Sequence, residues 1–239
     1  MALTNGAKQP CFFIVGAPKC GTTSLHYYLQ QHPKVFMATK ELHFFGKDFT
    51  YLDAPTPLNY YLSFFKDAQS SQLIGEASVW YLYSKLAAEE IKQTNPKAKI
   101  IMMLRNPVDM IYSLHSEQCY NGNENILSFE EALNAEESRL QGNLIPPNLG
   151  CPIEALQYRQ VGLFYQQVKR YLDVFGRDQV HCIFLSDLKE NVAGSFKEVL
   201  KFLQLDENVT IDYSIQNKHK VARSKAFTSL LRNLSLIHI

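Results

Sequence analysis

The sequence holds 239 residues, of which 46% are hydrophobic and 20% are charged. These proportions suit one sizeable folded core and exclude a disordered chain. The formal net charge of +1 excludes the strong overall field of a polyanion binder, so we expect no nucleic-acid partner, while a local basic patch stays possible.

Cysteine usage and hydropathy indicate the compartment. The odd number of cysteines and the absence of a CxxC pair predict isolated thiols in a reducing compartment, with one Cys119–Cys151 bridge as the alternative. No apolar run approaches the ~20 residues that cross a bilayer. The first ten residues lack the apolar stretch of a signal peptide. We therefore expect a soluble, cytoplasmic protein with no transmembrane segment.

Short apolar runs alternate with amphipathic stretches along the chain. The apolar runs predict strands at residues 11–15, 72–75, 99–104 and 180–185. Helices are predicted over residues 21–31, 58–65, 84–94, 106–118, 128–140, 158–175 and 192–203. Ser128 and Glu131 form a capping box for the fifth helix. This alternation predicts an α/β fold of three layers, a central parallel sheet flanked by helices, in a single domain over residues 1–239.

The turn between the first strand and the first helix is the most informative stretch. Such a turn points backbone N–H groups and a helix N-terminus at one spot, which binds an anion, usually a phosphate. Gly16 and Gly21 bound the turn, and Lys19 supplies a cation within it. The hydroxyls of Thr22 and Thr23 can donate further hydrogen bonds. The alternative is a structural turn with a solvent-exposed lysine.

The same turn differs from a Walker A motif in the position of its lysine. In GxxxxGK[ST] the lysine follows the second glycine, whereas here Thr22 follows Gly21 and the cation is Lys19. A nucleoside triphosphatase also needs an acidic residue for magnesium at the end of another strand. The best candidate strand is followed by Arg105 instead. The loop therefore favours a phosphorylated ligand over magnesium-dependent triphosphate chemistry, and a P-loop nucleoside or nucleotide kinase is the rival enzyme.

Arg105 and Ser113 form a candidate second anion site. Arg105 ends a predicted strand, at the sheet edge where open α/β folds bind ligands, and Ser113 follows two helical turns later. A guanidinium and a hydroxyl can hold a phosphate. An arginine that caps the sheet beside an ordinary helix serine is an equal alternative. Two separate anion sites would suit a doubly phosphorylated nucleotide, and 3′-phosphoadenosine-5′-phosphosulfate (PAPS) fits that description.

With these two motifs the chain resembles the PAPS-dependent sulfotransferases, most strongly the branch of heparan sulfate sulfotransferases and bacterial sulfotransferase domains. The resemblance covers roughly residues 11–225. It implies a P-loop-like fold, no metal, and transfer of a sulfuryl group from PAPS to an acceptor hydroxyl or amine. It also implies that the 5′ group and the 3′-phosphate are bound by Lys19, Cys20, Gly21, Thr22, Thr23 and Ser24, and by Arg105 and Ser113, respectively. Lys19 corresponds to the catalytic lysine of the family.

The resemblance further implies a general base in residues 40–45. Glu41 matches the glutamate that acts as base in the heparan sulfate enzymes, and His43 beside it is a possible helper or alternative base. Proton removal from an acceptor hydroxyl needs such a carboxylate or imidazole near the donor sulfur. Without the resemblance, a loop glutamate that faces solvent would be the simpler interpretation.

One position departs from this branch. Ala77 stands where the heparan sulfate enzymes carry a second active-site lysine, which weakens the case for a polysaccharide acceptor. Trp80 and Tyr81 are predicted either to line an acceptor pocket or to be core aromatics. The sequence leaves a carbohydrate, a lipid and a small hydroxylated metabolite open as acceptors.

A late basic segment, residues 217–225, resembles the segment that in bacterial relatives closes over the 3′-phosphate. It implies Lys220 and Arg223 as further nucleotide contacts, and a solvated basic run is the alternative. Residues 162–165 resemble, more weakly, the segment that approaches the adenine. Outside the enzymes, a nucleotide-binding module without turnover is the remaining hypothesis.

Overall fold

The computed structural model describes residues 8–49, 56–147 and 149–214, which fall into two compact units. The described part of the first unit runs to Asn106 and resumes at Phe164. That of the second runs from Pro107 to Leu163. The single domain expected from the sequence stays a prediction.

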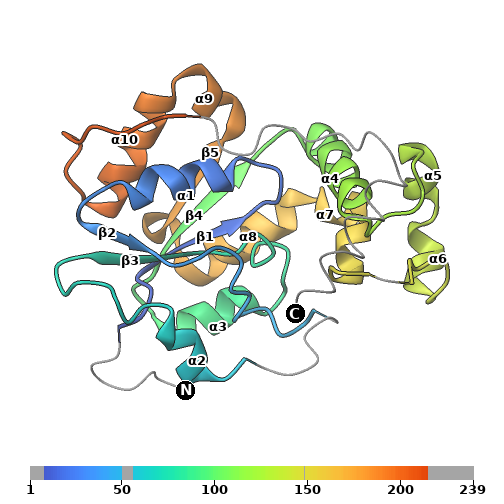
Figure 1. The fold of residues 1–239 in the computed structure, drawn as a ribbon, viewed down its shortest axis with the longest axis horizontal. Helices are drawn as coiled ribbons and strands as arrows, with labels where there is room; N and C mark the ends of the chain where they lie inside the picture. The colour runs from blue at the N-terminus through green and yellow to red at the C-terminus, as the bar shows by residue number, and fades with distance from the viewer. Residues whose placement is uncertain (1–7, 50–55, 148, 215–239) are drawn as a thin grey trace, which may run out of the picture. The chain divides into compact units, whose positions relative to one another are not determined.

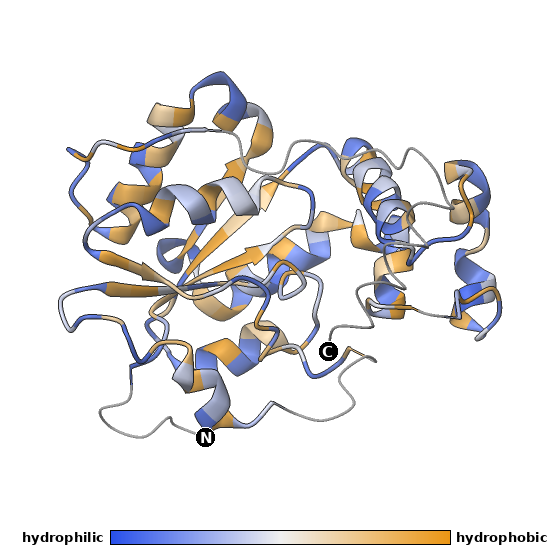
Figure 2. Cartoon of the chain, viewed as in Figure 1, coloured by the Kyte–Doolittle hydropathy of each residue, from blue (hydrophilic) through white to orange (hydrophobic). Residues whose placement is uncertain are grey.

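The first unit is built on a parallel sheet of five strands in the order β2-β3-β1-β4-β5. The strands are β1 (Phe12–Gly16), β2 (Val35–Met37), β3 (Leu73–Ala77), β4 (Lys99–Leu104) and β5 (Val180–Phe184). All five residues of β1 and the last five of β4 are buried. Figure 2 shows these strands as hydrophobic, the pattern of a parallel sheet covered on both faces.

Helices cover both faces of this sheet (Figure 1). One layer holds α1 (Thr22–Gln30), α9 (Leu185–Glu190) and α10 (Val192–Leu203), and the other holds α2 (Leu58–Ser63), α3 (Ala87–Thr94) and α8 (Phe164–Phe175). A 3-10 turn, η2 (Arg177–Gln179), leads into β5. The three-layer α/β fold expected from the alternation of strands and helices is therefore confirmed.

The second unit is helical. It contains α4 (Pro107–Asn121), α5 (Phe129–Asn134), α6 (Glu136–Leu140), η1 (Ile153–Leu156) and α7 (Tyr158–Val161). A fully buried ion pair lies in its core, where Arg139 Nη2 donates to Glu124 Oε1 at 2.8 Å and Tyr158 Oη donates to Glu124 Oε2 at 2.9 Å. Because both oxygens of Glu124 are bonded, the buried charge is compensated.

The predicted elements differ from the structure in four of the places that it describes. The short strand β2 and the helix α9 have no counterpart among the predicted elements. The helix predicted over residues 128–140 is two helices that meet at Ala135, although Ser128 Oγ accepts the Glu131 N–H as a capping residue should. The helix predicted over residues 158–175 is interrupted at residues 162–163.

Two findings bear on the expected compartment. All five cysteines lie in the described residues and none forms a disulfide, so the Cys119–Cys151 bridge is not present. Within the ranges that the structure describes, no helix is long and apolar enough to cross a membrane. The cytoplasmic location stays a prediction.

Candidate active site

The candidate site lies at the carboxyl ends of the parallel strands in the first unit. In the strand order, β2 lies on one side of β1 and β5 lies on the opposite side of β4. The connections that follow β1 and β4 therefore run in opposite directions along the sheet. The neighbouring strands β1 and β4 therefore flank a topological switch point, where open α/β sheets bind their ligands. The turn after Gly16 follows β1 and Arg105 follows β4, so both come directly after these two strands.

The turn after β1 has the backbone that its two glycines allow. Gly16 has φ 139°, and a Cβ there would lie 2.4 Å from the carbonyl oxygen of Val79. Gly21 has φ 89° and precedes α1. The Ala17 N–H donates to the carbonyl of Met103 at 2.7 Å, which fixes the turn against the end of β4. The anion loop expected from the sequence thus has a defined shape.

Lys40 contacts this loop, although its place in the sequence does not predict the contact. Its Nζ donates to Thr22 Oγ1 at 3.0 Å and to Thr23 Oγ1 at 3.2 Å. The same Nζ lies 3.6 Å from Glu41 Oε1. The only signal in the sequence was the position of Lys40 directly before the candidate base. One cation therefore links two predicted parts of the site.

Glu41 and His43 lie side by side, as their spacing suggested. Glu41 Oε2 accepts the Val79 N–H at 3.0 Å and is 3.3 Å from His43 Nε2. Burial lowers the pKa of His43 below its ordinary value of 6.5, although the Glu41 carboxylate opposes the shift. We therefore expect the imidazole to be neutral near pH 7. A carboxylate that is one-third exposed next to a neutral imidazole can accept a proton.

Backbone strain is concentrated at the predicted catalytic residues. Among the described non-glycine residues, five have positive φ, and three of these are Lys19 at 60°, Glu41 at 63° and His43 at 48°. A left-handed non-glycine residue costs about 1 kcal/mol or more and persists only where its surroundings hold it. Such outliers gather at ligand and catalytic sites, which supports a functional role for this set.

A buried carboxylate holds the segment that carries Glu41 and His43. Glu76, at the end of β3, accepts hydrogen bonds from Tyr61 Oη at 2.5 Å, Tyr81 Oη at 2.6 Å and Ser78 Oγ at 2.9 Å. Ser78 Oγ in turn accepts the backbone N–H of His43 at 3.1 Å. Burial raises the pKa of Glu76 to about 7, while its three hydrogen bonds oppose the shift.

The burial of Trp80 and Tyr81 decides whether these residues line an acceptor pocket or belong to the core. Tyr81 is fully buried and Trp80 is 8% exposed. Both are therefore core aromatics in this structure. Tyr81 serves the site indirectly, because its Oη also accepts the N–H groups of Phe44 and Phe45.

The remaining predicted contacts of the loop differ in what they can offer. Cys20 is fully buried, and burial raises the pKa of its thiol to about 12 against the opposing charge of Arg105. Its side chain is therefore a thiol, and only its backbone N–H suits an anion. Ser24 lies in the first turn of α1, where its N–H donates to the carbonyl of Gly21.

The two residues predicted to bind the 3′-phosphate belong to different units. Arg105 follows β4 in the first unit and is partly buried, whereas Ser113 lies in α4 of the second unit. Their pairing therefore stays a prediction. Lys220 and Arg223 lie outside the described residues.

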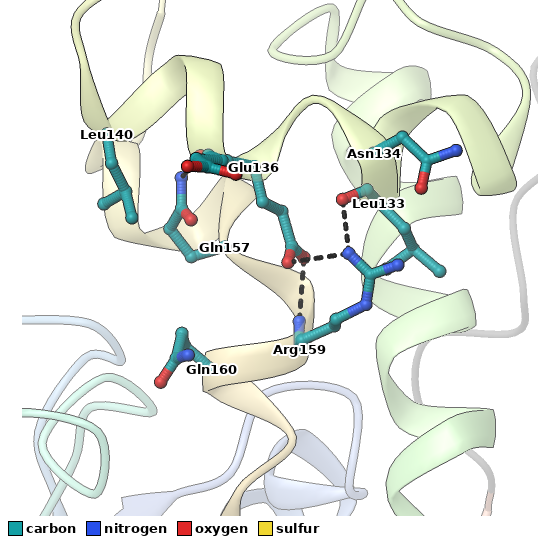
Figure 3. A pocket seen from close by; sticks show the side chains of 8 residues that line it. Leu133, Asn134, Glu136, Leu140, Gln157, Arg159 and Gln160 are labelled. Carbon is teal, nitrogen blue, oxygen red and sulfur yellow. Dashed lines mark hydrogen bonds and ion pairs between the residues drawn. The ribbon is translucent and has the colours of Figure 1, made fainter.

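The second unit also contains a pocket of about 340 Å³, between α5, α6 and α7. Figure 3 shows Arg159 directed at Glu136, whose carboxylate accepts the backbone N–H of Arg159 at 2.8 Å and its Nη1 at 3.2 Å. None of the predicted site residues lines this pocket.

Across the described residues, no group of three or more His, Cys, Asp or Glu side chains is arranged to hold a metal ion. Independence from metals stays a prediction.

Comparisons with known proteins agree with one another. A family model described as the sulfotransferase domain matches residues 9–235. The crystal structure of a sulfotransferase from Alicyclobacillus acidocaldarius has a TM-score of 0.78 and 34% identity, covering 96% of this chain and 91% of that chain. The crystal structure of mouse sulfotransferase SULT7A1 complexed with PAP has a TM-score of 0.51 and 20% identity, covering 85% of this chain and 61% of that one. These neighbours support the P-loop-like form of the fold.

Curated relatives are longer than this chain. Human bifunctional heparan sulfate N-deacetylase/N-sulfotransferase 2 is 27% identical over 82% of the chain, which spans 22% of that protein. Mouse carbohydrate sulfotransferase 15 is 29% identical over 82% of the chain, which spans 44% of that protein. The shared region corresponds to a part of each relative.

Proposed function

Because the chain belongs to the sulfotransferase domain family, we propose that it binds PAPS and transfers the sulfuryl group to an acceptor hydroxyl or amine. The observation that carries this proposal is the arrangement of the first unit. Lys19 follows β1, and Glu41 with His43 follows β2, so all three lie at the carboxyl ends of one parallel sheet. PAPS supplies an activated sulfuryl group, and the residues of the chain bind it and move one proton.

In the proposed reaction, Glu41 takes the proton of the acceptor hydroxyl or amine while the acceptor atom attacks sulfur. The bond between sulfur and the bridging oxygen of the donor breaks, and adenosine 3′,5′-bisphosphate (PAP) leaves. Lys19 stabilises the negative charge that develops on that oxygen. The backbone N–H groups from Cys20 to Thr23, with the hydroxyls of Thr22 and Thr23, hold the 5′ group by positioning and electrostatics.

The 3′-phosphate would be held by Arg105 and Ser113, with Lys220 and Arg223 as further contacts. An arginine fork provides the bidentate contact that suits a phosphate. For the acceptor we propose a carbohydrate first, because both curated relatives described above are named for carbohydrate sulfation. Ala77 supplies no cation at the end of β3, so a lipid or a small hydroxylated metabolite is the class to test next.

Thermal shift with nucleotides tests the donor. PAP should raise the melting temperature without magnesium, because its two phosphates meet donors that the chain itself provides. ATP with magnesium should raise it much less. A larger shift with ATP and magnesium would favour a nucleotide kinase instead.

Transfer of radiolabelled sulfate from PAPS to a panel of acceptors tests turnover. Carbohydrates, lipids and small hydroxylated metabolites form the panel, with mass spectrometry to identify the product. Tight PAP binding without transfer to any acceptor would favour a nucleotide-binding module without turnover.

A further inference from the structure

Lys40 contacts both the anion loop and the candidate base. Its Nζ is 3.0 Å from Thr22 Oγ1, 3.2 Å from Thr23 Oγ1 and 3.6 Å from Glu41 Oε1. The side chain is only 18% exposed, so this geometry is held by its surroundings.

The direction of the two hydrogen bonds decides what the threonines can do. An ammonium group has three donors and no acceptor, so Thr22 and Thr23 must accept from Lys40. A hydroxyl that accepts a hydrogen bond still has its own proton to donate. Helical threonines often donate that proton to a carbonyl one turn earlier. Here Lys40 occupies an acceptor site on each oxygen and leaves both protons available for an incoming anion.

Charge adds to this effect. A hydroxyl that is polarised by a neighbouring cation donates a stronger hydrogen bond to an anion than a hydroxyl without such a neighbour does. Thr22 is 4% exposed, so its hydroxyl lies in a poorly solvated place where such polarisation is least screened. The positive φ of Gly21 directly before it keeps the start of α1 next to the same loop.

We propose that Lys40 is a positioning residue of the donor site: it sets the hydroxyls of Thr22 and Thr23 as donors to the 5′ group of the nucleotide and ties that loop to Glu41. This inference rests on the proposed function, because it takes the 5′ group of PAPS as the anion. It places the second cation of the site on the segment after β2, at a position whose side chain reaches the loop from outside it.

Calorimetry with two nucleotides separates a local effect from a general one. PAP carries both phosphates, whereas adenosine 3′-monophosphate lacks the 5′ group. Lys40→Met should weaken PAP about 10- to 100-fold, the usual loss for hydrogen bonds assisted by charge, and should leave adenosine 3′-monophosphate within about twofold of wild type. Lys47→Met is the matched control, since Lys47 is exposed in the same segment, and it should change neither affinity.

A double-mutant cycle tests whether Lys40 acts through the threonines. When Thr22 and Thr23 are both replaced by valine, adding Lys40→Met should change the PAP affinity by less than about twofold. A full loss in that background would mean that Lys40 contacts the nucleotide directly and would overturn the proposal. Equal weakening of both nucleotides by Lys40→Met would also overturn it, because the effect would then be on the whole structure.

Failure of the proposed function looks different. If wild-type protein binds neither nucleotide, the donor assignment is wrong whatever Lys40 does. If wild type binds PAP and Lys40→Met binds it equally well, only the inference about Lys40 is wrong. Lys40→Gln, which keeps a polar side chain of similar length, serves as the second variant if Lys40→Met fails to fold, and the same losses are expected.

Discussion

Tyr81 donates a 2.6 Å hydrogen bond to the fully buried carboxylate of Glu76 and accepts the backbone N–H groups of Phe44 and Phe45 at 2.9 and 3.3 Å. One phenol thus connects the end of β3 to the segment that carries the candidate base. Without the Tyr81 oxygen, the N–H groups of Phe44 and Phe45 would lose this acceptor. An unsatisfied backbone N–H in a buried place costs folding free energy.

The charge of Glu76 should make stability depend on pH. Burial raises its folded pKa to about 7 from an ordinary value of 4.5. Between these values the folded protein holds a proton that the unfolded chain has lost, so the free energy of unfolding should fall as pH rises from about 4.5 to about 7. Above that window this group adds no further slope.

Glu76→Gln tests this expectation, because glutamine copies the shape of the protonated acid and does not titrate. In urea unfolding between pH 4.5 and 8, the free energy of unfolding of wild type minus that of the variant should fall as pH rises over the same window. The comparison must be a difference, since burial lowers the pKa values of His26 and His43 and their contribution rises with pH. Parallel profiles would show that Glu76 does not titrate in this range.

Tyr81→Phe should destabilise the protein and misplace the base. It removes one donor to Glu76 and one acceptor for Phe44 and Phe45, which should cost about 1–3 kcal/mol in urea unfolding. Turnover should fall more than PAP affinity, because the disturbed segment carries Glu41. Tyr60→Phe is the control, since Tyr60 is 58% exposed, and it should be close to neutral. Equal loss of turnover in both variants would exclude the positioning role of Tyr81.

Lys19→Ala should lower turnover far more than nucleotide affinity. A group that stabilises charge only in the transition state contributes about 10²–10³-fold to the rate and little to ground-state binding. Sulfate transfer from PAPS measures the first quantity and PAP calorimetry the second. Wild-type turnover in Lys19→Ala would contradict the assigned role, and Lys47→Met provides a charge-matched control.

The sequence was sufficient for four of the five strands and for the loop after β1, and the reasons are physical. The unbroken apolar runs of β1 and β4 are recognisable because parallel strands are buried on both faces. Gly16 and Gly21 mark the turn because their positive φ excludes most other residues. The three-residue strand β2 is too short to have a recognisable period.

The parts of the site that the sequence did not reveal depend on contacts between distant segments. Lys40 meets Thr22 and Thr23 across 17 or 18 residues, and Tyr61 meets Glu76 across 15. A buried glutamate in a strand carries no local signal, because its neighbours along the chain are apolar and its partners come from α2 and from the turn after β3. The fold brings these groups together, so only the structure identifies them.

Glu41→Gln should separate the two candidate bases. The amide keeps an oxygen that can accept the Val79 N–H, now made at 3.0 Å, so the segment should keep its shape. Because the amide cannot take a proton, kcat should fall about 10²–10⁴-fold, with PAP affinity nearly unchanged. Glu89→Gln is the control, since Glu89 is exposed on α3 and should leave kcat as in wild type.

His43→Asn completes this comparison. If His43 only supports Glu41, whose Oε2 lies 3.3 Å from its Nε2, kcat should fall modestly and the acid limb of the pH–rate profile should remain. If His43 is the base instead, kcat should collapse in His43→Asn and survive in Glu41→Gln. The wild-type acid limb would then lie below pH 6.5, because burial lowers the pKa of His43 and only the neutral imidazole accepts a proton.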